Sequence, residues 1–507
     1  MLDQTMDATT RAARIDQLWA QLCGDVSYGS LINGQVCRGE GEPVTIDDPA
    51  SGESLFAYPD AGARRAREAA KAAALARRSW YCDMTAAQRG RVMWHAAQQV
   101  RAHCEPLAEL EALSAGKPFR DTRVETAKVA EMFEYYAGWC DKLHGEVIPV
   151  PTSHFNYTER VPHGVVAQVT PWNAPIFTGG WQIAPALATG NTVVIKPSEL
   201  TPLSTVALGC LLQQAGVPEG AVNVLAGLGP TTGTAMFAAP EVQLAVFVGS
   251  PEIGRAIART AADRLIPCIL ELGGKSANVV FEDADLAKAA GGAAAGIYAA
   301  AGQSCVAGSR LLVQKSVYEE LLDRLAAKAR ALRLGPPEDP ETQVGPLNNT
   351  GQETRVLSYI DGARQAGARV ICGGQKEAPG NFVQPTVIAD VENDWIIAQD
   401  EVFGPVVVAM AFEDEQEAVR LTNQTRFGLA GAVWTGQVER AHRVAREIEA
   451  GTVWINGYKT IGVMSPFGGF KESGYGRSSG RDALMEYTRT RSIWTETSNT
   501  PAMAFGY

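Results

Sequence analysis

Gly164-Val-Val-Ala-Gln-Val-Thr170 is the first of several short, almost continuously apolar runs in this chain of 507 residues. Two more, Asn191-Thr-Val-Val-Ile-Lys-Pro197 and Leu244-Ala-Val-Phe-Val-Gly-Ser250, follow after segments of helical length. Apolar runs that no polar residue interrupts are typical of parallel strands whose two faces are both covered by helices. They predict an open α/β sheet.

A second series of such runs begins after Gly273. It is made of residues 277–281, 309–314, 405–412, 428–435 and 451–457, and amphipathic segments such as residues 317–332 lie between them. A single core usually stops growing at roughly 250–300 residues, so a chain of this length needs more than one. The sequence therefore predicts two open α/β domains that meet near Gly273.

The part of the chain before residue 164 has a helical character. Residues 63–80 are rich in Ala and Arg, and Thr85 followed by Gln88 predicts a capping box at the start of the next helix. A third helix is expected from about residue 121 to 144, with Gly145 as its C-cap, followed by a Pro-marked hairpin at residues 147–161.

Ligands of open α/β sheets bind beyond the carboxyl ends of the strands, so the loops after the runs are where chemistry is expected. The first loop is Pro171-Trp172-Asn173-Ala174-Pro175, a rigid turn that could hold the Asn173 amide as a fixed donor to an oxyanion. Taken alone, it also fits an ordinary turn bracketed by two prolines.

Two further loops have features of a nucleotide site. Lys196-Pro197-Ser198-Glu199 places a cation and a carboxylate three residues apart, where both could face ribose hydroxyls, although a solvated loop would look the same. Phe247-Val248-Gly249-Ser250 ends a strand and opens a helix through Pro251, and helix N-termini bind phosphate. Neither this loop nor Gly227-Leu228-Gly229 with Gly233 is a full dinucleotide fingerprint.

Two loops near the predicted domain boundary carry a base and a nucleophile. Glu271-Leu272-Gly273-Gly274-Lys275 places a carboxylate beside paired glycines that let the backbone approach a ligand closely. Gly302-Gln303-Ser304-Cys305 places a thiol in a loop of small residues after an Ala-rich helix. A free Cys is more often an inert core residue than a nucleophile, so only the combination of motifs favours a catalytic role.

Together these motifs resemble the aldehyde dehydrogenase superfamily. The resemblance rests on seven motifs in the family order: PWNAP at Pro171, KPSE at Lys196, FVGS at Phe247, ELGGK at Glu271, GQSC at Gly302, EVFGP at Glu401 and PFGGFKESGYGR at Pro466. It implies a Rossmann-like cofactor domain (residues 1–137 and 162–273), a catalytic domain (274–473) and a small β element for oligomerisation (138–161 and 485–507). The resemblance covers the chain roughly from Gly34 to Thr495.

The resemblance also implies the reaction, which is oxidation of an aldehyde to the carboxylic acid. Cys305 would be the nucleophile that forms a thiohemiacetal and then a thioester, Asn173 would stabilise the oxyanion, and Glu271 would be the general base for hydrolysis. One departure from many relatives is that Arg477 is followed by Ser478 and Ser479 instead of an acidic residue, which puts a proton relay there in doubt.

The implied cofactor is NAD, because the Glu199 carboxylate can accept from a ribose diol but repels a 2′-phosphate; use of NADP stays open. The residues expected to contact the cofactor are Thr170, Trp172, Lys196, Glu199, Gly229, Gly233, Gly249, Ser250, Leu272, Glu401 and Phe403. The residues expected to line a largely apolar substrate channel are Trp181, Ser304, Val306, Ile461 and Phe467. They leave open whether the aldehyde is aliphatic, aromatic or a semialdehyde.

Composition excludes several classes of protein. A formal charge of −11 and a pI near 5.3 argue against a nucleic-acid or anionic-membrane footprint. The nine cysteines and six histidines show no metal-ligand spacing, so no metal is expected. The first residues have no apolar targeting segment, and we expect a cytoplasmic protein with no membrane span.

Three other functions compete with hydrolytic aldehyde oxidation. They are a CoA-acylating semialdehyde dehydrogenase of the same fold, a non-catalytic protein that retains the fold, and a cysteine hydrolase without a redox step. Glu271 argues against the first, because CoA-acylating relatives generally lack that base. The hairpin at 147–161 and the tail RSIWTET at 491–497 look like strands without an intrachain role, so a homodimer or homotetramer is expected.

Overall fold

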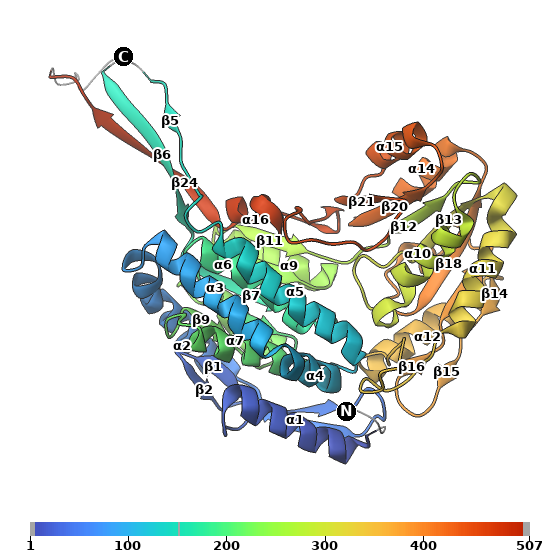
Figure 1. The fold of residues 1–507 in the computed structure, drawn as a ribbon, viewed down its shortest axis with the longest axis horizontal. Helices are drawn as coiled ribbons and strands as arrows, with labels where there is room; N and C mark the ends of the chain where they lie inside the picture. Colours follow the sequence, from blue (N-terminus) through green and yellow to red (C-terminus); the bar gives the residue numbers. More distant parts are fainter. Residues whose placement is uncertain (1–5, 151–152, 500–507) are drawn as a thin grey trace.

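The computed structural model describes residues 6–150 and 153–499. It contains two open, twisted α/β sheets and a three-stranded antiparallel sheet that stands away from both (Figure 1). The predicted α/β class is confirmed. Residues 1–5, 151–152 and 500–507 lie outside the described residues, and so do the parts of the expected hairpin and oligomerisation element that fall there.

The first sheet has eight strands, of which the five central ones are parallel. Their order is β2 (Gln35–Cys37), β1 (Ser30–Ile32), β9 (Val222–Val224), β8 (Thr192–Pro197), β7 (Val165–Thr170), β10 (Val242–Val248), β11 (Cys268–Glu271) and β23 (Gly474–Tyr475). The apolar runs quoted above form β7, β8 and β10 at the centre. The antiparallel edge strands β1, β2 and β23 come from distant parts of the chain, and their short lengths gave no clear sequence signal.

Helices cover both faces of this sheet, as uninterrupted apolar strands require. On one face α2 (Gly62–Arg77) packs against β7, β8 and β9 and contacts α8 (Thr234–Ala238), while α9 (Pro251–Asp263) packs on β10 and β11. On the other face α6 (Pro175–Ala188) and α7 (Leu203–Gln214) contact the strands. The outer layer on this side is α1 (Ala8–Cys23), α3 (Ala86–Ala102), α4 (Cys104–Ala115) and α5 (Phe119–Ala137). The two sides have separate apolar cores.

Two local predictions in this region have different outcomes. The capping box is confirmed, because Thr85 accepts from the Gln88 N–H and the Gln88 side chain accepts from the Thr85 N–H. The predicted end of the third helix at residue 144 is wrong, because α5 ends at Ala137 and the chain continues in i→i+3 turns at Trp139 and Lys142. Gly145 is not a helix cap. A Cβ at this position would clash with the Thr158 carbonyl oxygen, so glycine allows the backbone at residue 145 to pass close to β6.

The second sheet has seven strands, all parallel except β14 at one edge. Their order is β14 (Arg369–Cys372), β17 (Thr386–Ala389), β18 (Val406–Phe412), β13 (Arg310–Gln314), β12 (Ala277–Val280), β20 (Ala430–Trp434) and β21 (Thr452–Ile455). One face is covered by α10 (Leu286–Tyr298) and α11 (Tyr318–Ala331), and the other by α14 (Glu415–Asn423) and α15 (Val438–Glu447). α12 (Thr350–Gln365) and α13 (Ile396–Gln399) pack on each other. The second sheet and the helices that cover it share a separate apolar core, so the prediction of a second α/β unit is confirmed.

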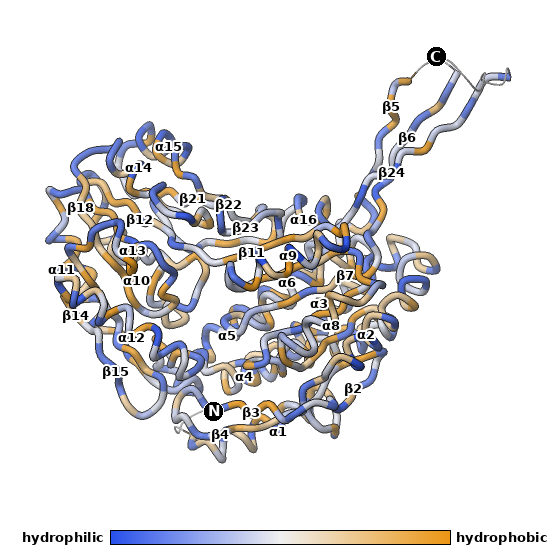
Figure 2. Tube along the Cα trace, turned by 180° about the vertical axis from the view of Figure 1, so that it is seen from behind, coloured by the Kyte–Doolittle hydropathy of each residue, from blue (hydrophilic) through white to orange (hydrophobic). Residues whose placement is uncertain are grey.

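The three-stranded sheet consists of β24 (Thr488–Glu496), β6 (His154–Pro162) and β5 (Val147–Ile148), and α16 (Gly480–Glu486) leads into it. The expectation that hairpin and tail lack an intrachain role is wrong, because β24 pairs with β6 along nine consecutive residues. The prediction failed because the two segments lie more than 300 residues apart. We call this three-stranded sheet the arm, because it stands away from the rest of the molecule. Figure 2 shows apolar segments within the arm, and its side chains Val147, Phe155 and Trp494 are exposed.

Three two-stranded ribbons complete the fold. They are β3 (Pro43–Asp47) with β4 (Ser54–Pro59), β15 (Lys376–Glu377) with β16 (Phe382–Val383), and β19 (Phe427–Gly428) with β22 (Phe470–Lys471). Within residues 6–150 and 153–499, no helix combines the length and the apolar character that crossing a bilayer would require.

Candidate active site

The loop that carries Cys305 follows α10 through a tight turn in which Ala300 and Ala301 have φ of 54° and 53°. Few residues adopt this left-handed conformation, and here it reverses the chain so that the thiol faces the first sheet's loops. The Cys305 residue is only partly buried. Burial nevertheless raises the pKa of the thiol to about 12, Glu401 and Glu271 raise it further, and Lys459 lowers it. Resting Cys305 is therefore a thiol and needs a base.

Asn173 connects this loop to the end of β7. Its Nδ2 donates to the Gln303 carbonyl oxygen at 2.9 Å, two residues before the thiol. Asn173 lies in the turn between β7 and α6, where Pro175 starts the helix, so its backbone is fixed at both ends. The amide thus lies beside the Cys305 loop with a second N–H available.

Glu271 is the last residue of β11, and its carboxyl group is buried; among the residues that the structure describes, neither oxygen has a hydrogen-bond partner. Burial raises the pKa of Glu271 to about 8, and nearby Ser478 and Arg477 partly offset this. Ser478 also accepts a hydrogen bond from Trp181 Nε1 at 2.8 Å. A carboxyl group with a pKa near the working pH, close to a buried thiol, has the properties of a general base.

Glu401 lies between the two glycines of the ELGGK segment and the thiol. Its Oε1 accepts from the Gly274 N–H at 3.1 Å, and a Cβ at Gly273 would lie 2.3 Å from its Oε2. Burial raises the pKa of Glu401 to about 7. A side chain at position 273 would displace this carboxylate from its present place, so glycine there allows the close approach.

Phe403, two residues after Glu401, contacts Trp172, the residue before Asn173. Their rings meet edge to face with centroids 5.3 Å apart, and Phe403 has a left-handed φ of 59°. The two residues come from different α/β units, so this contact brings the loops of both sheets together.

The predicted cofactor residues of the first sheet lie along the carboxyl ends of β7, β8, β10 and β11. Lys196 Nζ donates to the carbonyl oxygens of Pro197 and Gly227 at 2.8 and 2.9 Å, and it lies 3.5 Å from the half-exposed Glu199 carboxylate. Burial lowers the pKa of Lys196, while Glu199 raises it. The ammonium group of Lys196 is therefore already hydrogen-bonded within the protein. The half-exposed Glu199 carboxylate is accessible to a ligand.

The predicted cofactor glycines and Ser250 lie at the same carboxyl edge of the first sheet. Ser250 is the N-cap of α9 and accepts from the Ile253 N–H at 3.4 Å, directly after Gly249. Gly229 begins the turn that continues to Gly233, which lies beside the Lys196 side chain. A helix N-terminus of this kind can take an anionic phosphate.

Thr170 is the last residue of β7, and Leu272 directly follows β11. The Thr170 hydroxyl is buried and has no partner among the described residues, and the Leu272 N–H donates to the Ser473 carbonyl at 3.0 Å. An unpartnered hydroxyl, an exposed carboxylate and a capped helix N-terminus fit the polar parts of a dinucleotide. The residues present are therefore suitable for holding one.

One residue of this edge was missed from the sequence. Asp60 accepts from the Leu228 N–H at 2.8 Å and from Thr232 Oγ1 at 2.6 Å, which fixes the turn that contains Gly229. It lies in the connection before α2, more than 160 residues from the loop it holds, and no local pattern marks it.

The predicted channel residues gather around the thiol. Trp181 stacks on Phe177 with centroids 5.2 Å apart and meets Phe467 edge to face at 6.0 Å. Val306 is buried in a small apolar cluster against which Cys305, Ile461 and Phe467 pack. Ser304, beside the thiol, is partly buried. The approach to Cys305 is thus largely apolar.

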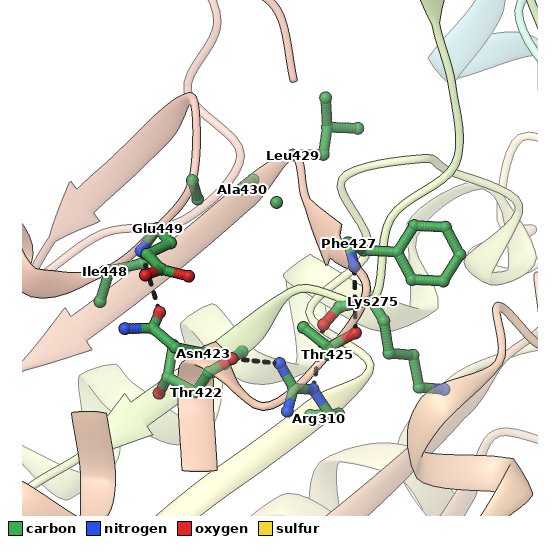
Figure 3. A pocket seen from close by; sticks show the side chains of 13 residues that line it. Lys275, Arg310, Thr422, Asn423, Thr425, Phe427, Leu429, Ala430, Ile448 and Glu449 are labelled. Atoms are coloured by element: carbon green, nitrogen blue, oxygen red, sulfur yellow. Dashed lines mark hydrogen bonds between the residues drawn. The ribbon is translucent and has the colours of Figure 1, made fainter. Parts of the chain in front are cut away.

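A small cavity lies on the side of Leu429 and Ala430, two residues of this apolar cluster. It is lined by Lys275, Arg310, Thr422, Glu449 and their neighbours, and Figure 3 shows the Arg310 guanidinium hydrogen-bonded to backbone groups of this pocket, among them the Thr422 carbonyl at 2.7 Å. Its volume of about 10 Å³ holds about one water molecule, so it cannot take a substrate.

Comparison with known proteins identifies the family. The family model described as "Aldehyde dehydrogenase family" matches residues 37–493. The chain is 43% identical over 458 residues to a putative aldehyde dehydrogenase of Bacillus subtilis (90% of this chain, 92% of that protein). It is 42% identical over 456 residues to a betaine aldehyde dehydrogenase of Cereibacter sphaeroides (90% and 94%). The solved structure of an NAD+ complex of an aldehyde dehydrogenase from Bacillus cereus matches with a TM-score of 0.92 at 39% identity, covering 94% of this chain and 98% of that one.

The class defined by the fold and the site is an α/β protein with a cysteine placed between two open sheets. The chain belongs to the aldehyde dehydrogenase family, so the predicted family is confirmed.

Proposed function

We propose that this protein oxidises an aldehyde to a carboxylic acid with NAD+ through a covalent intermediate on Cys305. The observation that carries the proposal is the convergence of a thiol, a fixed amide and a buried carboxyl with raised pKa on one apolar approach. Asn173 and Glu271 come from the first sheet and Cys305 from the second.

The first half of the reaction forms the covalent intermediate. Glu271 accepts the thiol proton, directly or through a water molecule, and the sulfur of Cys305 adds to the aldehyde carbon as the carbonyl electron pair moves to oxygen. The second N–H of the Asn173 amide and the Cys305 backbone N–H stabilise the resulting oxyanion. When bound, NAD+ supplies the hydride acceptor that converts the thiohemiacetal to a thioester.

The second half releases the acid. Glu271 first releases the thiol proton to solvent. In its ionised form it then takes a proton from water, the hydroxide adds to the thioester carbonyl, and the C–S bond breaks with the electron pair returning to sulfur as a thiolate. The apolar walls formed by Trp181 and Phe467 keep other water away from the thioester.

The residues that would hold the cofactor are those at the carboxyl edge of the first sheet. Glu199 would accept from the ribose diol, the α9 N-terminus after Gly249 would take the pyrophosphate, and Glu401 with Phe403 would hold the nicotinamide ribose. A 2′-phosphate beside Glu199 would place like charges together, which favours NAD over NADP. The relative from Bacillus cereus was solved as an NAD+ complex, which supports this assignment.

The proposal includes the domain roles and the assembly. Residues 1–137 and 162–273 would bind the cofactor, residues 274–473 would carry the catalytic cysteine, and residues 138–161 and 485–507 would mediate a homodimer or homotetramer. Support for the last role comes from the arm, whose exposed Phe155 and Trp494 and unpaired edge strand suit burial against another subunit.

CoA-acylating oxidation is the alternative within the same fold. In that reaction a CoA thiol replaces water, and no general base for water is needed. The buried Glu271 favours hydrolysis. The deciding experiment measures NADH formation from an aldehyde with and without CoA and identifies the product as free acid or acyl-CoA. Cleavage of an activated ester without NAD+, combined with no NADH formation from any aldehyde, would instead show a hydrolase.

A further inference from the structure

Lys459 lies in the loop after β21 and is tied to the Cys305 loop on both sides. On one side, Tyr458 Oη donates to the Val306 carbonyl oxygen at 3.0 Å. On the other, Ile461 packs on the same apolar cluster as Cys305. Lys459 itself has a left-handed φ of 64°, and the following carbonyl, that of Thr460, accepts from Trp454 Nε1 at 2.9 Å. The loop therefore holds the lysine beside the nucleophile in a fixed backbone conformation.

The ammonium group of Lys459 has no partner in the part of the chain that the structure describes. Over residues 6–150 and 153–499 it makes no hydrogen bond and no ion pair within 4.0 Å, although the residue is partly buried. Burial lowers its pKa, which Glu125 and Asp121 partly restore. A cation that is withdrawn from water without a counter-ion is unfavourable, and a bound anion would remove the cost.

The carboxylates that face Lys459 already have other cations. Glu125 is hydrogen-bonded to Lys117, and Asp121 lies 3.3 Å from Arg120. The charged groups that act on the pKa of Cys305 are Glu401 and Glu271, which raise it, and Lys459, which lowers it. The two glutamates belong to the proposed cofactor and base positions, so the unpaired charge on the substrate side of the thiol is positive.

We propose that Lys459 selects aldehydes that carry a carboxylate, so that the substrate class is an aldehyde acid with an apolar body. The inference rests on the proposed aldehyde oxidation. Trp181, Phe467 and Ile461 supply the apolar walls for the body of the substrate, and Lys459 meets its anionic end. The same charge disfavours a cationic aldehyde at this position.

The first test compares kcat/KM with NAD+ for glutaric semialdehyde, pentanal and betaine aldehyde, which are anionic, neutral and cationic. The wild type is expected to favour the anion over the neutral aldehyde by tenfold or more and to use the cation least. In Lys459→Met this anion-to-neutral ratio falls at least tenfold, and Lys459→Arg restores most of it. Lys328→Met, which removes an exposed lysine of α11, leaves the ratio unchanged. A wild-type ratio near one, or an unchanged ratio in Lys459→Met, would overturn the inference.

The second test needs neither NAD+ nor an aldehyde. Alkylation of Cys305 by anionic iodoacetate and by neutral iodoacetamide is followed by mass spectrometry of the Cys305 peptide. Division of the two rates removes the effect of Lys459 on the thiol pKa, because both reagents react with the same thiolate. The iodoacetate-to-iodoacetamide ratio is expected to fall several-fold in Lys459→Met, to stay close to wild type in Lys459→Arg, and to keep its value in Lys328→Met. An equal ratio in wild type and Lys459→Met refutes anion attraction at this position.

The two tests separate the inference from the proposed function. Loss of the alkylation preference in Lys459→Met combined with no oxidation of any aldehyde would refute the proposed oxidation and the substrate class, leaving an anion site beside Cys305. Oxidation of all three aldehydes without charge preference would support the proposed function and refute the role of Lys459.

Discussion

Replacement of Glu271 by Gln is the perturbation that tests the proposed mechanism most directly. The carboxyl group is buried, it has no hydrogen-bond partner among residues 6–150 and 153–499, and burial raises its pKa to about 8. With such a pKa roughly one tenth of the group is ionised at pH 7 and roughly nine tenths at pH 9, so deacylation by the ionised base should rise about tenfold over this range. The direction follows from the role: a base works only when deprotonated, so activity is lost as the pH falls through 8.

The Gln variant removes the base while keeping the volume of the side chain. Its steady-state rate should fall about 10²–10⁴-fold and lose the rise between pH 7 and pH 9. Quenched-flow measurement should still show about one equivalent of NADH per Cys305, formed more slowly at neutral pH because Glu271 also accepts the thiol proton. The burst should recover at high pH, where the thiolate forms unaided.

Glu111→Gln provides a matched control. Glu111 is another buried carboxyl whose pKa is raised by burial, but it lies in α4 and accepts hydrogen bonds from the Ile176 N–H and Ser204. This variant should keep the pH-dependent rise if Glu271 causes it. A full steady-state rate in Glu271→Gln, or a rise that disappears only in Glu111→Gln, would refute the assignment of the base.

Three further predictions concern the nucleophile, the cofactor and the assembly. Cys305→Ala should abolish aldehyde oxidation while NAD+ binding, measured by calorimetry, stays within a few-fold of wild type, because Cys305 is not one of the residues proposed to hold the cofactor; retained turnover would contradict the mechanism. Glu199→Ser should raise kcat/KM with NADP+ relative to NAD+ by roughly tenfold, since one like-charge contact is removed; a wild type that already favours NADP+ would show the assignment to be wrong. Light scattering should give a dimer or tetramer at micromolar concentration, and Trp494→Glu on the exposed arm should shift it towards monomer; a monomeric wild type would refute the role of the arm.

The sequence was sufficient for the features that depend on neighbours along the chain. Uninterrupted apolar runs are dictated by burial on both faces of a sheet, so residues 165–170 and 406–412 could be assigned as strands from their composition alone. The Thr85 capping box and the Ser250 helix start are also local, because their hydrogen bonds span three residues. The ordered motifs then indicated the family and the candidate residues Cys305, Asn173 and Glu271.

Tertiary structure alone decided the features that depend on distant contacts. Three contacts each join segments more than 100 residues apart: the pairing of the tail with the 154–162 strand, the hydrogen bond from Tyr458, beside Lys459, to the Cys305 loop, and the placement of Glu401 over Gly273. The raised pKa of Glu271 belongs to the same group, because it arises from burial by residues that fold around the end of β11. Periodicity records which face of an element is buried, but it does not record which other element buries it. The motifs therefore determined the candidate reaction, and the contacts between loops determined which charge we propose to meet the substrate.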